Sequence, residues 1–325
     1  MKFSILFLAQ TSRDIHRTAN HHNNSGYTIL QAQYPMTSKF FQSFSLPSNL
    51  VLDVLIQPWL LEDIGRGDRV TQALMVKGSQ RNNATWIAKE TGIIAGLPIA
   101  ARVFQLLDSQ VEFEVCLKDG DRAMAGETIA KISGPFEALL TGERVALNLA
   151  MRLSGIATAT ERFVAQLEGL NTRFADTRKT TPGHRILEKY ASQVGGAVNH
   201  RMGLDDSAMI KDNHIAAAGG IAEAIALVRA QIPYPLTVEV ETETLAQVQE
   251  ALDHGADIIM LDNMPILTMG EAVILIRQYS DRILIEASGN VSIDSIRSIA
   301  ETGVDIISSS APMTRSSWMD LSMRF

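Results

Sequence analysis

Residues 236–263, LTVEVETETLAQVQEALDHGADIIMLDN, hold two short β-branched runs on either side of a helix-like segment. The first run, residues 236–242, ends at Glu241-Thr242, and the second, residues 257–263, ends at Asp262-Asn263. Between them the apolar residues recur at helical spacing. A strand, a helix and a second strand in succession are typical of a βαβ unit, in which the two strands lie parallel in one sheet.

The same alternation continues over residues 173–311. Further strand-like runs are RFADT (173–177), AMIKDN (208–213), ILIEASGN (283–290) and DIISSSA (305–311), and GAVNHR (196–201) predicts one more strand. Helix-patterned segments separate these runs, which favours a parallel α/β barrel. About 140 residues are too few for the usual eight units at roughly 250 residues, so we expect an incomplete barrel with fewer than eight strands.

The sequence before residue 172 has a different pattern. Helical patterns, Gly-rich turns and short runs typical of antiparallel strands are mixed there, which predicts an α+β region. Residues 136–168 predict a long helix interrupted near Ser154-Gly155. Residues 1–35 are largely polar and without a packed pattern, and we expect them to be a leader or an extension.

Composition excludes several classes of protein. The chain of 325 residues has 36 Asp plus Glu against 29 Lys plus Arg, and this acidic balance argues against a protein that coats nucleic acid or an anionic membrane. A single cysteine, Cys116, cannot form an internal disulfide, which fits a reducing, cytoplasmic compartment. No apolar run approaches the roughly 20 residues that span a bilayer.

Charged side chains stand at or just after the ends of the predicted barrel strands. Because the carboxyl ends of parallel strands meet on one face of a barrel, we expect these side chains to converge. The cations are Arg178, Lys179, Arg201 and Lys211. Like charges gathered in a partly dry cleft repel one another, so the group predicts a polyanionic ligand.

Acidic and small residues follow at the next strand ends. Glu241 and Asp262 offer oxygens that can hold sugar hydroxyls or the water around Mg²⁺. Ser288-Gly289 and residues 308–311 (Ser308, Ser309, Ser310 and Ala311) let backbone N–H groups approach a phosphate. Along the strand ends of the predicted barrel, the residues therefore suit first a carboxylate, then sugar hydroxyls and then a phosphate.

Seven segments resemble, in order and spacing, the quinolinate phosphoribosyltransferase family, also called carboxylating nicotinate-nucleotide pyrophosphorylases. They are LLEDIGRGDRVTQAL (60–74), GERVALNLAMRLSGIAT (142–158), ADTRKTTPGHRILEKYA (175–191), GGAVNHRMGLDDSAMIKDNHI (195–215), VEVET (238–242), DIIMLDNM (257–264) and EASGN (286–290). The resemblance implies transfer of phosphoribose from phosphoribosyl pyrophosphate to quinolinate. The products would be nicotinate mononucleotide, pyrophosphate and CO₂, on the de novo route to NAD and with Mg²⁺ as cofactor.

The resemblance also implies an architecture. We expect an N-terminal α/β sandwich domain over residues 36–155, with residues 312–325 packing back on it, and a catalytic barrel over residues 156–311. Family members are homodimers, some of which assemble further, and the partner subunit completes each site.

Site residues follow from the resemblance position by position. Arg178, His200, Arg201 and Lys211 match the quinolinate-binding cations, with Arg144 reaching in from the other subunit. Lys179, Lys211, Glu241 and Asp262 match the catalytic contacts to phosphoribosyl pyrophosphate, and the two Ser-rich loops match the sites of its 5′-phosphate. Asn290 and Ser310 stand where the family commonly has Gly, and an added Cβ restricts the backbone that approaches a phosphate.

Two other functions fit parts of the pattern. One is a related phosphoribosyltransferase acting on another ring acid, including the molybdenum-associated paralogues, but the intact DTRKTTPG (176–183) favours quinolinate. The other is a non-catalytic binder of phosphorylated metabolites. Retention of Glu241 and Asp262 argues against it, because acidic groups weaken simple anion binding.

Overall fold

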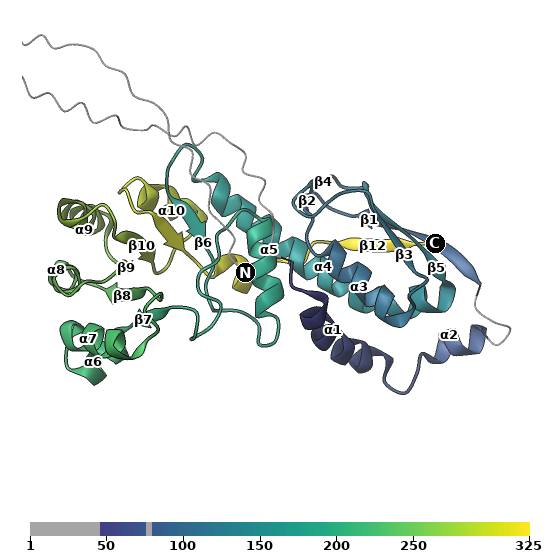
Figure 1. Cartoon of the computed structure of the whole chain (residues 1–325). Helices are drawn as coiled ribbons and strands as arrows, with labels where there is room; N and C mark the ends of the chain where they lie inside the picture. The colour runs from purple at the N-terminus through teal and green to yellow at the C-terminus, as the bar shows by residue number, and fades with distance from the viewer. Residues whose placement is uncertain (1–45, 76–79) are drawn as a thin grey trace, which may run out of the picture. The chain divides into compact units, whose positions relative to one another are not determined.

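The computed structural model describes residues 46–75 and 80–325 of the chain (Figure 1). The predicted leader or extension, residues 1–35, lies outside the described residues. Over the described ranges, no helix combines the length and the apolar character that crossing a membrane requires.

The N-terminal domain is built on an antiparallel sheet. Its four strands, in the order β12-β1-β5-β3, are β12 (Leu321–Arg324), β1 (Arg81–Ala88), β5 (Thr128–Pro135) and β3 (Glu112–Val115). A second pairing joins β2 (Gly92–Ile93) to β4 (Arg122–Ala123). Ala84, Trp86 and Ala88 are buried at alternate positions of β1, so one face of the sheet carries the core.

Helices α3 (Leu97–Leu107) and α4 (Phe136–Ala165) cover that face. Helices α1 (Asn49–Ile64) and α2 (Arg69–Leu74) pack on them, α1 on both and α2 on α4. Trp86 of β1 packs edge-on against Phe104 of α3, with ring centroids 6.3 Å apart. The fold of this region is therefore a sheet with helices packed on it, as the α/β sandwich prediction requires.

Helix α4 runs without interruption from Phe136 to Ala165, so the predicted break near Ser154-Gly155 is wrong. Gly155 serves close packing instead, because a Cβ at this position would lie 2.0 Å from the Ser317 carbonyl oxygen. The C-terminal chain passes over α4 there, where the Met319 N–H donates to Met151 O at 3.0 Å, and then joins the first sheet as β12.

The second half of the chain forms a six-stranded parallel sheet. The order β6-β11-β10-β9-β8-β7 connects β6 (Arg173–Ala175), β11 (Ile306–Ser308), β10 (Leu284–Ser288), β9 (Ile258–Asp262), β8 (Val238–Thr242) and β7 (Ala208–Ile210). Among the described strands no pairing joins β7 to β6, so the barrel is incomplete, as predicted. The strand predicted over GAVNHR is reduced to one parallel bridge, Val198 to Ala175.

A helix follows most of these strands. The helices are α5 (Arg185–Val194), α6 (Asp212–Ala218), α7 (Ile221–Gln231), α8 (Leu245–Asp253), α9 (Ile266–Tyr279), α10 (Ile293–Ala300) and α11 (Ala311–Arg315). Thr244 and Ser292 cap α8 and α10 through their side chains, which sets where the chain turns from strand to helix. Val240 and Ile259 of the sheet share one core with Val248 and Leu252 of α8.

Strand register brings distant residues level with one another. Ser288 of β10 lies beside Asp262 of β9, and Ser308 of β11 lies beside Ala175 of β6. Strand ends that are up to 133 positions apart in the sequence, from Ala175 to Ser308, therefore lie at one edge of the sheet.

Candidate active site

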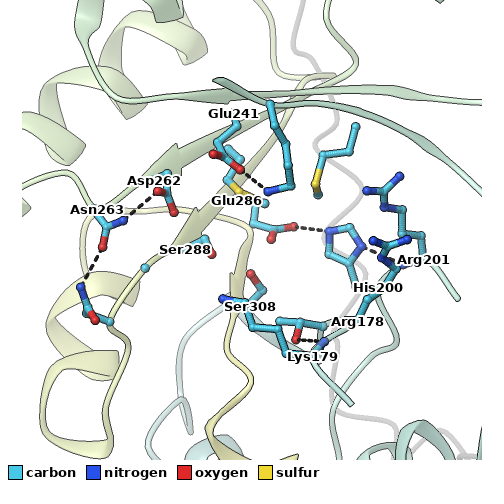
Figure 2. Close-up of a pocket in the computed structure, with 16 residues that line it drawn as sticks. Arg178, Lys179, His200, Arg201, Glu241, Asp262, Asn263, Glu286, Ser288 and Ser308 are labelled. Carbon is cyan, nitrogen blue, oxygen red and sulfur yellow. Dashed lines mark hydrogen bonds and ion pairs between the residues drawn. The ribbon is translucent and has the colours of Figure 1, made fainter. Parts of the chain in front are cut away.

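A cavity of about 490 Å³ lies at the carboxyl ends of the barrel strands (Figure 2). Ten of the predicted site residues line it: Arg178, Lys179, His200, Arg201, Lys211, Glu241, Asp262, Ser288, Gly289 and Ser308. An adjoining cavity of about 210 Å³ is lined by Ser309, Ser310 and Ala311, and it shares Lys179, Ser288 and Ser308 with the first. The convergence expected from the strand pattern is present in one chain.

Arg144 lines neither cavity. It lies on α4, in a separate cavity of about 560 Å³ that it shares with Trp59, Arg152 and His184. A contact between Arg144 and the strand-end cavity thus stays a prediction about the partner subunit.

The cation edge of the cavity consists of Arg178, Lys179, Arg201 and Lys211. Lys211 is paired with Glu241, whose Oε2 lies 2.5 Å from Nζ. The Arg201 side chain donates to Ser207 O at 2.9 Å. Burial, and the charge of Arg178 nearby, lower the pKa of Arg201. The repulsion expected between gathered cations is therefore present, and an anion that enters would relieve it.

A buried ion pair supports the cation edge from behind. Lys189 of α5 forms this pair with Asp176, which precedes Arg178 by two positions, and both side chains are at most 1% exposed. Asp176 Oδ1 also accepts the His200 N–H at 2.8 Å, so the same carboxylate ties the loop after β6 to the loop that carries His200 and Arg201. Burial raises the pKa of Asp176 and lowers that of Lys189, so desolvation opposes their attraction.

His200 is held by three neighbours. Its Nε2 lies 3.3 Å from Glu239 Oε2 and 3.4 Å from Glu286 Oε2, and its Nδ1 accepts the Arg201 N–H at 2.7 Å. Both ring nitrogens thus have protein partners. A direct contact between His200 and a substrate carboxylate requires one of these bonds to break.

The His200, Glu239 and Glu286 cluster retains a proton. Burial alone lowers the pKa of His200, but the hydrogen bonds with the two glutamates outweigh it and raise the pKa to about 10. Burial also raises the pKa of Glu239. Because Nδ1 accepts a backbone hydrogen bond, it carries no proton and the ring has its N–H at Nε2. The additional proton that the cluster retains is therefore held by the carboxylates, where burial raises the pKa of Glu239.

The phosphate edge consists of residues 288–290 and 308–311. Gly289 has φ 96°, and Asn290 keeps a left-handed φ of 49° despite its Cβ. Ser309 Oγ donates to Val291 O at 3.4 Å and accepts the Ala311 N–H at 3.3 Å, which joins the two loops. Asn290 therefore adopts the backbone region that Gly would provide.

Sequence reasoning missed four residues of this region. Glu239 and Glu286 precede Glu241 and Ser288 by two positions, and alternation along a strand places them on the same, inward face. The alternation along the strand could therefore have identified both glutamates from the sequence. Asn263 lines the larger cavity and Arg315 the smaller, but both follow the strands in loop or short-helix positions that no periodicity marks.

Two family models cover the described domains. The quinolinate phosphoribosyl transferase C-terminal domain matches residues 156–324, and the N-terminal domain of the same family matches residues 68–154. This chain belongs to the quinolinate phosphoribosyltransferase family. The resemblance found in the seven sequence segments is thus confirmed.

Two relatives from the same family match 86% and 80% of this chain. A probable carboxylating nicotinate-nucleotide pyrophosphorylase of Synechocystis sp. is 57% identical over 279 residues, which span 86% of this chain and 94% of the relative. The Homo sapiens carboxylating nicotinate-nucleotide pyrophosphorylase is 36% identical and matches 80% of this chain and 86% of its own. The solved structure of NadC from Streptococcus pyogenes superposes with a TM-score of 0.82 at 41% identity, over 86% of this chain and 98% of that one.

Proposed function

We propose that the strand-end cavity binds quinolinate beside phosphoribosyl pyrophosphate and carries out the transfer reaction of the quinolinate phosphoribosyltransferase family. One observation carries this assignment: four cations, three carboxylates (Glu241, Asp262 and Glu286) and two loops of small residues, contributed by different strands, line two joined cavities. The cation edge suits the carboxylates of a ring diacid, because Arg makes paired hydrogen bonds to planar carboxylates. The phosphate edge suits the 5′-phosphate.

Glu241 of β8 and Asp262 of β9 lie on the two strands between β7, which precedes Lys211, and β10, which ends at Ser288, and the ribose would be placed there. The pyridine nitrogen attacks the anomeric carbon while the bond from that carbon to pyrophosphate breaks, and positive charge develops on the ribose. Carboxylates fixed beside that charge stabilise it. Lys211 holds Glu241 at 2.5 Å, so the same pair reaches both substrates.

Decarboxylation needs no further group from the protein. The ribosylated ring nitrogen is cationic and accepts the electron pair left when the adjacent carboxylate departs as CO₂, and a proton then takes its place on the ring. Met209 and Met260 add apolar surface to the cavity wall, which limits water around the ring.

The donor set is compatible with Mg²⁺ carried by pyrophosphate. Asp262 is partly exposed, and among the described residues only its Oδ2 accepts a side-chain hydrogen bond, so Oδ1 can accept from a water of the hydrated ion. When bound, Mg²⁺ would neutralise the charge of the leaving pyrophosphate. Lys179, which lines both cavities, adds a fixed cation for the same purpose.

We also propose that the chain works as a homodimer. Five apolar side chains on α1 and α2 are at least 66% exposed: Leu50, Val54, Leu61, Val70 and Leu74. Apolar residues this densely exposed on adjacent helices are typical of an interface. The cavity that contains Arg144 is lined by α1 as well, which supports Arg144 as a residue offered to a partner.

Production of CO₂ and nicotinate mononucleotide from quinolinate and phosphoribosyl pyrophosphate tests the proposed reaction. We expect CO₂ release that requires both substrates and Mg²⁺. Tight binding of both substrates with no product would instead indicate a non-catalytic binder.

Mixed dimers test the shared site. Arg144→Ala and Lys211→Ala are each expected to be inactive, and mixing the two proteins should restore activity, because one hybrid site carries neither substitution. Absence of any recovery, with hybrids shown by mass to form, would contradict the shared site.

A further inference from the structure

Asp262 is connected to the phosphate edge by two side-chain amides. Its Oδ2 accepts a hydrogen bond from Asn263 Nδ2 at 2.7 Å, and Asn263 Oδ1 accepts one from Asn290 Nδ2 at 3.0 Å. Figure 2 shows this series of bonds crossing from the end of β9 to the loop after β10. We call Asn290, Asn263 and Asp262 the amide relay.

The direction of the relay follows from chemistry. An ionised carboxylate only accepts hydrogen bonds, so Asn263 must turn its Nδ2 toward Asp262. Its Oδ1 then faces Asn290, which must in turn present Nδ2. Each amide therefore has one favourable orientation, and Asp262 receives a donor on one defined oxygen.

The backbone is shaped to hold the relay. Asn263 has φ 52° and Asn290 has φ 49°, and they are the two residues other than Gly with positive φ in the described chain. The Asn263 N–H donates to Ser288 O at 2.9 Å, which places the Asn263 side chain over Gly289. A Cβ on Gly289 would lie 2.2 Å from Asn263 Oδ1, so the lack of a side chain there makes room for the amide.

Packing does not account for the two amides. Both asparagines are exposed, so burial of their side chains does not offset a strained conformation. A non-Gly residue in the left-handed region raises the energy of the backbone, and two such residues in contact beside a catalytic carboxylate indicate a functional constraint.

We propose that Asn263 and Asn290 are positioning residues that orient the Asp262 carboxylate toward the ribose and couple its orientation to the loop that receives the 5′-phosphate. This inference rests on the proposed function. A phosphate that binds residues 288–290 fixes the position of Asn290. Through its hydrogen bond to Asn263, Asn290 then fixes the orientation of Asp262. Phosphate binding at one end thereby prepares the carboxylate at the other.

Two substitutions of Asn290 separate the effect of its amide hydrogen bond from the effect of its backbone conformation. Asn290→Gly keeps the left-handed conformation accessible but removes the amide. Asn290→Asp keeps the size but turns the donor into an acceptor facing Asn263 Oδ1, so it drives the Asn263 amide out of its orientation. We expect Asn290→Asp to lower kcat/KM for phosphoribosyl pyrophosphate about tenfold and Asn290→Gly about threefold. Neither should change the KM for quinolinate or the Tm.

A second background shows whether Asn290 acts through Asn263. In Asn263→Gly, which also permits positive φ, we expect Asn290→Asp and Asn290→Gly to give equal activities, because the link to Asp262 is already absent. An equal tenfold loss from Asn290→Asp in both backgrounds would show charge repulsion of the phosphate and would overturn the relay. Full activity of Asn290→Asp in the native background would overturn it as well.

If Asn263→Gly has no measurable turnover, the affinity of Asn290→Asp for inorganic phosphate gives a second test. The relay predicts that Asn290→Asp lowers turnover by at least about threefold more than it lowers phosphate affinity measured by calorimetry. Equal losses would assign the effect to repulsion.

Asn83→Asp, on an exposed position of β1, is the matched control and should behave as the native protein. Activity of the native protein tests the proposed function separately. If that activity is present and the Asn290 variants match it, only the relay fails.

Discussion

The two edges of the active-site cavity are held in place by different means. The cation edge depends on side chains, and buried charges behind it hold them: Asp176 with Lys189, and Glu239 and Glu286 with His200. The phosphate edge depends on backbone turns, small residues and the left-handed conformation of Gly289 and Asn290. No ion pair links its residues to another part of the described chain.

The difference follows from what each edge is proposed to bind. Several cations held close together need fixed geometry and nearby opposite charge, and burying that opposite charge requires partners for it in turn. A phosphate is bound well by N–H groups, which need only close approach and no Cβ in the way. One edge can thus be disturbed through buried charges, and the other through the conformation of its backbone.

The largest effect is expected from the interior of the cation edge. Lys189→Met leaves the Asp176 carboxylate buried without its cation and should lower the free energy of unfolding by about 3–5 kcal/mol. Denaturation by urea measures this change. The double variant Asp176→Asn, Lys189→Met should recover part of the loss, because Asn keeps an acceptor for the His200 N–H. Lys131→Met, exposed on β5, is the control. A loss no larger than that of the control would show that the buried pair does not support this edge.

Lys211→Ala sharpens the comparison at the surface of the same edge. It removes a contact to the transition state and the partner of Glu241, so we expect kcat to fall at least about 100-fold. The Tm should stay within a few degrees of the native value, because the Lys211 side chain is 43% exposed. Steady-state kinetics beside thermal unfolding measure both. Near-normal turnover would remove Lys211 from the mechanism.

Arg315 tests the phosphate edge. It lines the smaller cavity, and no hydrogen bond or ion pair joins its side chain to another described residue. We expect Arg315→Ala to raise the KM for phosphoribosyl pyrophosphate about tenfold, as loss of one charged contact would. The KM for quinolinate and the Tm should not change. Arg282→Ala, an exposed cation outside both cavities, is the control. A change in the KM for quinolinate instead would place Arg315 at the wrong edge.

The smallest effect is a dependence of stability on pH. The folded-state pKa of His200 is raised from 6.5 to about 10, so its cluster contributes stability fully below pH 6.5 and loses it as pH rises through about 10. Between pH 7 and 10 the free energy of unfolding should fall by at least about 1 kcal/mol more in the native protein than in Glu239→Gln. Urea unfolding over this range, compared between the two proteins, checks the sign. If the free energy of unfolding changes with pH in the same way in the two proteins, the cluster does not hold a proton more tightly in the folded state than in the unfolded state.

The α/β barrel was predictable from the sequence because its strands are short apolar runs with clear ends. The predicted runs at 236–242 and 257–263 contain β8 and β9, and the six strands form one parallel sheet. The ends of these strands also identified the cations, acids and serines that line the cavity. The confirmed family resemblance added the reaction, which no spacing of residues specifies.

Other features depended on contacts between distant segments. Gly155 is a helix breaker by propensity, yet α4 continues through it because the C-terminal chain packs against that position. Asn290 looked like an obstacle to phosphate binding, whereas its backbone keeps the required conformation and its amide meets Asn263. The family resemblance placed His200 among the quinolinate-binding cations, whereas three protein groups contact its ring nitrogens.

By itself the sequence determined the alternation of strands and helices, the residues at each strand end and the membership of the family, because hydrophobic periodicity and motif spacing are local properties of the chain. Only the tertiary structure decided which of those residues are free to bind a ligand. Hydrogen bonds form between side chains as many as 164 positions apart, and their partners depend on strand register and on the conformation of single loop residues.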